Sequence, residues 1–408
     1  MRIVLVSPCG WGNLGDAAIQ DSVILELERL GVLRSEISAV TQVPSDTRAR
    51  HGIDCGRLES RRPTRGRLPT IAFVVLLALH DIWHWIYAVR LMKRTDILVI
   101  SGGGQLDDYW GGAFGHPYSL FKWTSAARLC GARVVMLSVG AGVLRSSFSR
   151  LFVRLALILC HYRSFRDCRT GELVSELFGI RDPLVVPDLA FGHPSRVSDP
   201  EITRPTSDAP IAVSPMAFRS PVSWPDKDEA AYHSYINRLG DTVVALIAAG
   251  RSVTVFTTDG QDMRAATDLM LYLGHQLGPE LLPRVVRKDT DSVSAAIAVI
   301  RHSELVIASR LHGVILSHVS ARPVIALSYD WKVDQHMLDM AQTDLCLSID
   351  RFRNTEVLDL VFRVHSSYPD RTMVVAERVA TFAGMVLAQY KAAMLGPRSR
   401  FCSLGETA

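Results

Sequence analysis

The chain has 408 residues, of which 48% are hydrophobic and 21% are charged, and its formal net charge is +4. This composition is typical of a globular protein, and the length favours two domains over one. The small net charge gives no indication of a nucleic-acid partner. The seven cysteines are odd in number and contain no CxxC pair, which argues against a disulfide framework or a zinc ribbon and predicts a reducing compartment. We expect no bound metal.

The first element is an apolar strand over residues 2–6, followed by the glycine loop Gly10–Gly15 and a helix. The loop reads GxGxxG, which is compatible with a dinucleotide-binding turn or with helix amides left free for an anion. A dinucleotide site also needs an acidic residue at the end of the second strand, and the strand predicted over 37–43 ends without one. The sequence therefore disfavours a nicotinamide or flavin cofactor. Asn13 and Asp16 are not needed in a plain phosphate loop, and Asp16 is either a helix N-cap or a functional side chain.

A long apolar segment, residues 71–89, approaches the length of a membrane-spanning helix. His80, Asp81 and His84 interrupt it near the middle, where charge is costly in lipid, so we expect a helix packed inside the protein or lying on a membrane surface. Basic residues precede the segment and favour contact with anionic lipid; they are Arg57, Arg61, Arg62, Arg65 and Arg67. The predicted location is cytoplasmic, either in solution or at the inner face of the cell membrane.

Strand and helix patterns alternate along the chain, which is typical of parallel sheets with helical crossovers. A proline-rich stretch without apolar periodicity, residues 193–210, is predicted to be a linker. It would separate an N-terminal domain, 1–192, from a C-terminal domain, 211–395, and a tail would follow over 396–408. The predicted fold class is α/β, with two Rossmann-like, doubly wound parallel-sheet domains facing a cleft. The predicted strands cover residues 2–6, 37–43, 97–100, 134–139, 184–186, 211–214, 253–257, 285–286, 305–308 and 324–327, and the last helix covers 376–394.

Ligands of doubly wound sheets bind at the carboxyl ends of the strands, so the residues that follow each strand are informative. Strand 97–100 runs into Gly102–Gly104, and Asp107 and Asp108 follow. Consecutive glycines let a ligand approach the backbone, and carboxylates accept hydrogen bonds from hydroxyl groups. This loop is predicted to bind a ligand, with a simple tight turn as the alternative.

In the second half of the chain, strand 305–308 leads to Arg310 and His312, which open a helix. An arginine, a titratable histidine and the amides of a helix N-terminus together make an anion site. Lys332 follows the next strand and adds a positive charge. The sequence therefore predicts that an anionic ligand binds here.

Four stretches together resemble the polysaccharide pyruvyl transferase family: GNLGDAAI, ISGGGQLDD, SFRDCRTGELVSELFGIRDPLVVPDLAF and SRLHGVILSHVSARPVIALSYDWK. The resemblance covers residues 1–345. It implies a GT-B-like fold and a reaction that transfers the carbon skeleton of phosphoenolpyruvate to a sugar as a cyclic ketal, with release of phosphate. The acceptor would be a sugar, a polysaccharide such as an exopolysaccharide, or a lipid-linked glycan of the cell envelope. No cofactor is implied, because phosphoenolpyruvate is a co-substrate.

The resemblance also implies which side chains bind the donor. His312 would be either the general acid that protonates the donor or only a ligand of its phosphate. The family's Arg-x-His and tyrosine-to-lysine motifs, together with one further arginine, assign phosphoenolpyruvate binding to Arg310, Leu311, His312, Lys332 and Arg219, with Arg166 as the alternative to Arg219.

The acceptor side is assigned to the two glycine-rich regions. A sugar hydroxyl needs a base, and the candidates are Asp107, Asp108 and Asp16. The expected acceptor-binding residues are Asn13, Asp16, Gly103, Gly104 and Asp107.

Two other functions remain open at this stage. A GT-B glycosyltransferase that uses a nucleotide sugar would share the fold and the basic donor site. A non-catalytic scaffold at a membrane surface would account for the apolar segment 71–89 and its basic approach. The oligomeric state is not indicated.

Overall fold

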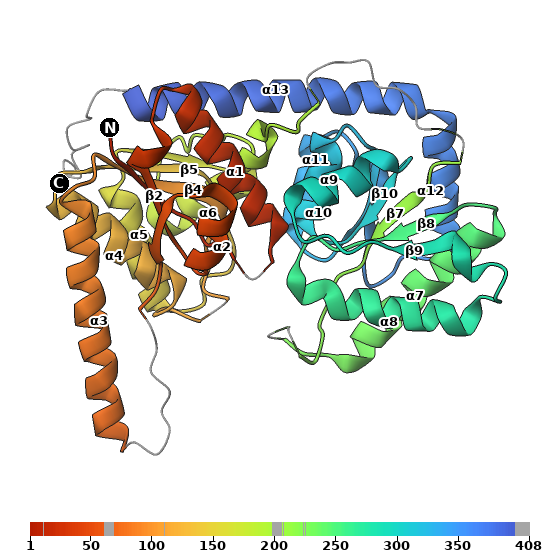
Figure 1. Cartoon of the computed structure of the whole chain (residues 1–408), viewed down its shortest axis with the longest axis horizontal. Coiled ribbons are helices and arrows are strands. Elements are labelled where there is room, and N and C mark those ends of the chain that lie inside the picture. The colour runs from red at the N-terminus through yellow and green to blue at the C-terminus, as the bar shows by residue number, and fades with distance from the viewer. Residues whose placement is uncertain are drawn as a thin grey trace. The chain divides into compact units, whose positions relative to one another are not determined.

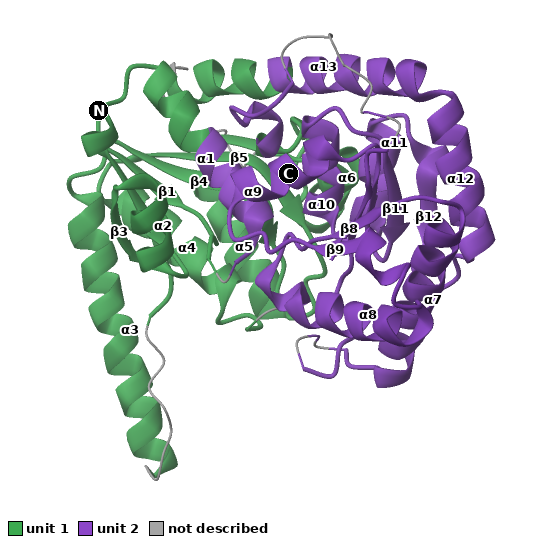
Figure 2. Cartoon of the chain, turned by 45° about the vertical axis from the view of Figure 1, so that its right-hand side comes forward, with its two compact units in different colours: residues 1–10, 23–189, 385–408 green, residues 11–22, 190–384 purple. Residues whose placement is uncertain are grey.

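Figure 1 shows the computed structural model of the chain, which describes residues 1–10, 12–60, 69–109, 111–197, 206, 208–222, 224 and 226–395. The chain divides into two compact units (Figure 2): unit 1 is Met1–Gly10, Val23–Leu189 and Met385–Ala408, and unit 2 is Trp11–Ser22 and Ala190–Gly384. Parts of the predicted segments lie outside the described residues: Arg61, Arg62, Arg65 and Arg67 of the basic cluster, 198–205 and 207 of the linker, and the tail 396–408.

Unit 1 contains a six-stranded parallel sheet in the order β3-β2-β1-β4-β5-β6. Its central strand β1 reads IVLV and is buried throughout, because a parallel strand is covered on both faces. Ile3 lies opposite Ile37 of β2 and Ile97 of β4, which sets the register. The strands are β1 (Ile3–Val6), β2 (Ile37–Thr41), β3 (Asp54–Arg57), β4 (Ile97–Leu106), β5 (Arg133–Ala141) and β6 (Tyr162–Phe165).

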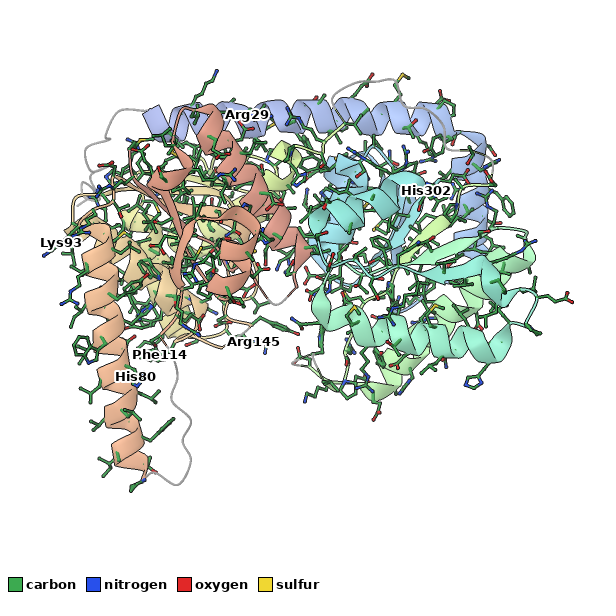
Figure 3. All side chains as sticks on the ribbon, in the orientation of Figure 1. Arg29, His80, Lys93, Phe114, Arg145 and His302 are labelled. Atoms are coloured by element: carbon green, nitrogen blue, oxygen red, sulfur yellow. The ribbon has the colours of Figure 1, made fainter. Side chains whose placement is uncertain are left out.

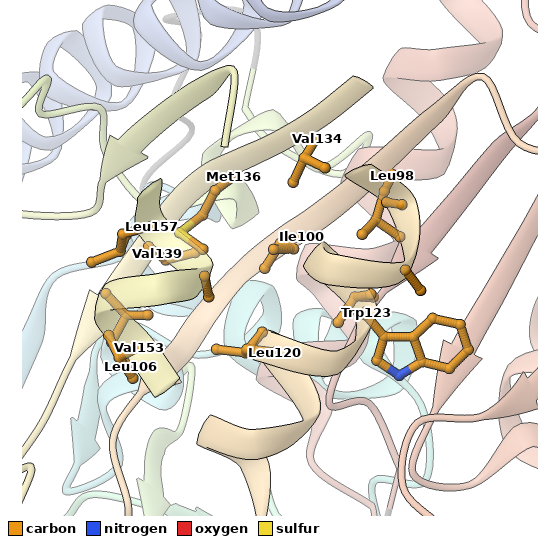
Figure 4. Packing of buried hydrophobic residues seen from close by; sticks show 14 of the residues in the cluster. Leu98, Ile100, Leu106, Leu120, Trp123, Val134, Met136, Val139, Val153 and Leu157 are labelled. Atoms are coloured by element: carbon orange, nitrogen blue, oxygen red, sulfur yellow. The ribbon is translucent and has the colours of Figure 1, made fainter. Parts of the chain in front are cut away.

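The core of unit 1 forms where helices pack on β4 and β5 (Figure 4). Leu98 and Ile100 of β4 contribute to the same buried cluster as Trp123. The buried Trp123 indole donates a 2.9 Å hydrogen bond to the Leu58 carbonyl, so this polar group is satisfied. The helices that belong to or enter unit 1 are α1 (Leu14–Arg29), α2 (Pro44–His51), α3 (Thr70–Met92), α4 (His116–Leu129), α5 (Ser147–Leu159), α6 (Cys168–Phe178) and the end of α13 (Tyr368–Leu395).

Unit 2 contains a second six-stranded parallel sheet in the order β12-β11-β10-β7-β8-β9. The strands are β7 (Ile211–Ser214), β8 (Val253–Val255), β9 (Val285–Arg287), β10 (Val306–Ala308), β11 (Val324–Ser328) and β12 (Cys346–Ser348). The helices are α7 (Glu229–Ala248), α8 (Met263–Gln276), α9 (Val293–His302), α10 (Leu311–Val319), α11 (Trp331–Asp339), α12 (Asn354–Ser366) and α13 (Tyr368–Leu395). Two parallel sheets with helical connections confirm the predicted α/β fold class.

The structure differs from the sequence-based prediction in several elements. The predicted strand 97–100 continues through the three glycines to Leu106, with a register shift between Gly103 and Leu106. The predicted strand 184–186 is reduced to one bridge between Val185 and Phe165. The strands β3, β6 and β12 were not predicted, and the last helix begins at Tyr368.

The unit boundaries also differ from the predicted division. Residues 11–22, which contain the first glycine loop, group with unit 2, and residues from Met385 onward group with unit 1. Two of the four boundaries, those after Ser22 and after Gly384, fall inside continuous helices, α1 and α13. The chain therefore passes between the units more often than a single linker would require.

Candidate active site

Four neighbouring strands of unit 2 end at the same edge of its sheet, because β11, β10, β7 and β8 are parallel. Ser214, at the end of β7, accepts a 3.4 Å hydrogen bond from the amide of Ser309, which follows β10. The Ser309 hydroxyl also lies 2.9 Å from the hydroxyl of buried Tyr235 on α7. Buried polar contacts therefore hold the loops at this edge of the sheet, and these loops contain the predicted donor residues.

Arg310 follows β10 and is held by two buried carboxylates. Its Nε and Nη2 donate hydrogen bonds of 2.7 and 2.9 Å to Asp262, and its Nη1 lies 3.6 Å from Asp259 Oδ2. Burial alone would lower the pKa of the Arg310 guanidinium, but Asp262 and Asp259 raise it above its ordinary value. Arg310 therefore stays charged and keeps one orientation.

The pair with Asp262 limits how Arg310 can meet an anion. The edge of the guanidinium formed by Nε and Nη2 is already engaged, so a ligand would approach through Nη1 and the outer side of Nη2. Burial raises the pKa of the nearby Asp259 carboxyl, and the positive charge of Arg310 opposes this shift. The Arg310 guanidinium therefore shares its hydrogen-bonding capacity with Asp262 of the protein.

His312 lies in the first turn of α10, and its ring packs directly against Gly15. A Cβ atom added to Gly15 would lie 1.9 Å from Cγ and 2.0 Å from Nδ1 of His312, so any side chain at this position would displace the imidazole. Along α10, all of whose residues are described, His312 is the residue that is not fully buried. Arg310 is the N-cap of α10, and its side chain makes no capping hydrogen bond. The start of this helix is therefore the part that can face a ligand.

The first glycine loop packs against the same edge of unit 2. The amide of Leu14 donates a 2.9 Å hydrogen bond to the Thr258 carbonyl, and the Gly260 amide donates a 3.1 Å bond to the Gly12 carbonyl. Asn13, which we expected on the acceptor side of the N-terminal domain, thus lies in unit 2 with the predicted donor residues.

Asn13, and not Asp16, caps helix α1. Its side-chain oxygen accepts from the amides of Gly15 and Asp16 at 3.0 and 3.2 Å, and its Nδ2 donates to Asp16 Oδ2 at 2.9 Å. The interpretation of Asp16 as the N-cap is wrong, because it lies within the first helical turn. The idea that these amides are free for an anion is also wrong, since the protein itself binds them.

The other predicted donor residues lie around the same edge. Lys332 is in the first turn of α11, after β11, and its amide donates to the N-cap Asp330. Arg219 follows β7 with a backbone φ of +53°, and its side chain is 3.7 Å from Asp228 Oδ2. Leu311 is buried in α10 and contributes packing. The structure brings Arg310, His312 and Lys332 to adjacent strand ends, whereas Arg219 points partly to solvent.

The predicted acceptor loop of unit 1 is tied down by a buried polar pair. Gln105 donates from Nε2 to the Ser101 carbonyl at 2.6 Å, so its Oε1 faces His116 Nε2 at 2.8 Å. This fixes the proton of His116 on Nε2, as assigned from the hydrogen-bond network. Gly103 has a φ of +76° and Gly104 is exposed. Asp107 is half-buried and follows the end of β4.

Asp108 has a structural role that argues against its use as a base. Its carboxylate accepts hydrogen bonds from the amides of Arg145 and Ser146 and from the Ser149 hydroxyl, at 2.6–3.1 Å. Burial would raise the pKa of Asp108, but these bonds hold it below its ordinary value. It fastens the start of α5 to the end of β4.

Arg166, the alternative to Arg219, is a buried residue of unit 1. Its guanidinium lies 3.5 Å from both Asp167 and Asp188, and it packs against Gly140, where a Cβ atom would lie 2.7 Å from Nη2. Arg166 is therefore engaged by carboxylates of its own unit, and its removal would leave two buried carboxylates without this charge partner. Arg219 therefore remains the better donor candidate.

Sequence reasoning missed the residues that organise Arg310. Asp259 and Asp262 follow β8, and Asp262 also accepts a 2.8 Å hydrogen bond from the Ala217 amide. The rule that strand ends carry function would have found the run Thr257–Asp262 if it had been applied there. Buried hydroxyls of Ser214 and Thr258 lack hydrogen-bond partners within the part of the chain that the structure describes. These two hydroxyls can therefore still form hydrogen bonds at this edge of the sheet.

The side chains that commonly bind metals do not form a cluster in the described residues. In the residues that the structure describes, no group of three histidine, cysteine, aspartate or glutamate side chains could hold a metal ion.

A family model for polysaccharide pyruvyl transferases matches residues 13–330 of the chain. The match begins at Asn13, within the first glycine loop, and it includes the glycine-rich strand β4 and the residues Arg310, His312 and Tyr329. Lys332 lies two residues beyond its end. No curated protein matches the sequence significantly.

Solved structures resemble the fold at low sequence identity. S. aureus MnaA with UDP has a TM-score of 0.57 and 11% identity, over 99% of this chain and 100% of that chain. The UDP-GlcNAc 2-epimerase from Neisseria meningitidis has a TM-score of 0.60 and 11% identity, over 97% and 100%. A glycosyltransferase from Rickettsia africae has a TM-score of 0.58 and 10% identity, over 96% and 98%. These likenesses confirm the predicted GT-B-like fold class.

Proposed function

Because the chain belongs to the polysaccharide pyruvyl transferase family, we propose that it forms a pyruvate ketal on a sugar, with phosphoenolpyruvate as donor. The acceptor is a sugar of a polysaccharide or of a lipid-linked glycan, and the reaction takes place on the cytoplasmic side. The observation that carries the proposal is the position of Arg310 and His312 at the uncapped start of buried helix α10, with Lys332 after the neighbouring strand.

The reaction needs one proton donor and two sugar hydroxyls. His312 protonates the methylene carbon of phosphoenolpyruvate, and the first hydroxyl attacks the adjacent carbon. Phosphate leaves with its electron pair, and the second hydroxyl attacks the same carbon and closes the ring. Of the two hydroxyl protons released, one replaces the proton given by His312 and the other leaves with phosphate, so the step is balanced.

The donor's negative charges are held by fixed cations in this proposal. Arg310 presents its outer nitrogens to the phosphate or the carboxylate, while Asp262 keeps the guanidinium in place. Lys332 adds a second charge, and the first amides of α10 point toward the same region. Arg219 would add a third cation on binding.

The acceptor is assigned to the glycine-rich end of β4 in unit 1. The close backbone approach at Gly103 and Gly104 and the half-buried carboxylate of Asp107 suit a sugar ring and its hydroxyls. Asp107 is the proposed base, because Asp108 is committed to the start of α5. Asp16 is the second candidate base, and Asn13 braces its carboxylate.

Phosphate release from phosphoenolpyruvate, measured with and without a panel of bacterial glycans, tests the reaction. Carbon label from the donor should appear in the glycan. If phosphate release never depends on an added or co-purified glycan and no label transfers, the proposed reaction is wrong.

Two variants separate binding from chemistry. His312→Gln keeps hydrogen bonding but cannot deliver a proton, so kcat should fall about 10²- to 10⁴-fold with little change in the KM for phosphoenolpyruvate. Arg310→Lys keeps the charge but loses the planar fork, so this KM should rise. The control is His275→Gln, an exposed histidine at the end of α8. A loss of donor affinity with unchanged kcat in His312→Gln would make His312 a phosphate ligand.

A nucleotide-sugar reaction is the second candidate, because similar solved structures were obtained with UDP or UDP-GlcNAc. Thermal unfolding with each ligand distinguishes the two. A rise in the melting temperature with UDP-sugars, and none with phosphoenolpyruvate, would favour the glycosyltransferase. A folded protein that responds to neither and turns over neither would favour the non-catalytic scaffold.

A further inference from the structure

Helix α3 exposes a continuous apolar stripe. Ile71 is 81% exposed and Trp83 is 65% exposed, although both are large apolar side chains. The exposed residues recur at helical spacing; they are Ile71, Val74, Val75, Leu79, Ile82, Trp83, Ile86 and Tyr87. Within the described residues, α3 is the helix that is long and apolar enough to cross a membrane, and only 6% of its apolar window is buried. Something outside unit 1 must cover this surface.

The first part of α3, Ile71–Leu79, contains no polar side chain on any face. Figure 1 shows this end of the helix standing clear of the sheet and the other helices of unit 1. A groove on a protein covers one face of a helix, whereas a helix that is apolar all round fits a hydrocarbon medium. This segment is therefore suited to lipid.

Asp81, the acidic residue of α3, faces unit 1 and is paired there. Asp81 accepts 2.5 Å hydrogen bonds from the ammonium of buried Lys122 and from the hydroxyl of Tyr118. The Trp85 indole donates to the same hydroxyl at 2.9 Å. The carboxylate that argued against a membrane-spanning helix is thus paired within unit 1, beyond the apolar end.

A second apolar contact surface lies on unit 1 beside the base of α3. Ring contacts run from Trp85 through Phe121 and Phe152 to Phe114 and Phe148, with centroid separations of 5.5–6.3 Å. Phe114 and Phe148, at the end of this series, are 62% and 58% exposed. Figure 3 shows Phe114 at the same end of the unit as His80, where α3 projects from its unit.

The length of the apolar end decides how deep it can reach. A rise of about 1.5 Å per residue makes Ile71–Leu79 about 12 Å long. One leaflet offers about 15 Å of hydrocarbon, and a span needs about 30 Å. The remainder of α3 cannot follow, because Ala88 and Met92 are buried in unit 1.

We propose that α3 inserts Ile71–Leu79 into a single leaflet of a bilayer, with Trp83 in the interfacial region and Phe114 and Phe148 resting on the surface. The ligand is the lipid bilayer itself. This inference does not depend on the proposed reaction, and its tests measure binding and depth rather than turnover.

Flotation of the full chain with vesicles of phosphatidylethanolamine and phosphatidylglycerol in equal parts tests the insertion. The double variant Val75→Glu with Leu79→Glu should lower the partition coefficient at least about tenfold, because both charges would enter hydrocarbon. The matched control is Leu271→Glu with Phe362→Glu, two exposed apolar residues of unit 2, which should bind as the wild type does. Equal flotation of both double variants would overturn the proposal.

Fluorescence quenching by brominated lipids measures the depth. The fluorescence of Trp83 is the difference between the wild type and Trp83→Phe. This fluorescence should be quenched most by bromine near the headgroup and least by bromine near the bilayer centre. Strongest quenching at the centre would indicate deeper insertion and overturn the one-leaflet assignment. The wild type could instead form an oligomer that is lost in the Val75→Glu, Leu79→Glu variant, while neither protein binds vesicles. That result would show that a second copy of the chain covers α3, and it would also overturn the proposal.

Discussion

Replacing Gly15 with alanine should disable the proposed chemistry more than it disturbs folding. The added Cβ atom would lie 1.9 Å from Cγ of His312, whereas real Cβ contacts almost never fall below 3.0 Å. The backbone of α1 accepts alanine, because Gly15 is not among the residues with positive φ. The imidazole must therefore move by about 1 Å to relieve the contact.

The two effects of this substitution differ in size. Overpacking typically costs about 1–3 kcal/mol, and alanine in a helix returns up to about 1 kcal/mol, so the free energy of unfolding should fall by about 0–3 kcal/mol. A 1 Å displacement of a reacting group costs about 10²-fold in rate. Gly15→Ala should therefore remain folded and lose most of its phosphoenolpyruvate turnover.

Urea unfolding and acceptor-dependent phosphate release measure the two quantities on the same preparation. Gly274→Ala is the matched control, because Gly274 lies in α8 with no atom near the place of a new Cβ. It should keep full turnover and gain slightly in stability. Wild-type turnover in folded Gly15→Ala would refute the reasoning that the position of His312 governs the reaction.

Three further predictions concern stability. Asp262→Asn breaks a buried pair with Arg310 and should lower the unfolding free energy by about 3 kcal/mol in urea titration; an unchanged value would contradict that role. Because the pKa of Asp108 lies below its ordinary value in the folded state, the wild type should lose stability as the pH falls below about 4. Asp108→Asn should flatten this acid slope, and an equal slope in both proteins would count against it. Burial lowers the pKa of His116 to about 4, so unfolding free energy should decrease from about pH 6.5 down to about pH 4. His116→Gln should remove this decrease, and parallel pH profiles would disprove the assignment.

The sequence predicted the buried strands better than the edge strands. Central strands such as β1 are continuous apolar runs, because both of their faces are covered. The edge strand β3 reads DCGR, with Asp54 and Arg57 exposed, and β12 is only partly buried. Such short, half-exposed strands lack an apolar pattern, and their pairing depends on the neighbouring strand rather than on their own composition.

The sequence predicts the candidate site only for residues that directly follow a recognisable strand. Arg310, His312 and Lys332 follow recognisable strands, so the rule for strand ends finds them. The packing of Gly15 on His312 and the bond from Leu14 to Thr258 join residues far apart in sequence, and no periodic pattern indicates such contacts. For this reason the first loop was assigned to the wrong unit, and the partners of Arg310 were overlooked.

The boundaries inside α1 and α13 affect how this gene can be divided. A cut at the predicted linker, 193–210, would leave the segment 11–22 on one polypeptide and the rest of unit 2 on the other. The C-terminal fragment would also carry residues from Met385 onward that belong to unit 1. Each half alone would lack part of its own compact unit, so separate expression should give insoluble products, while co-expression of both halves should restore a folded pair. Insertions are better tolerated in surface loops that lie within one unit.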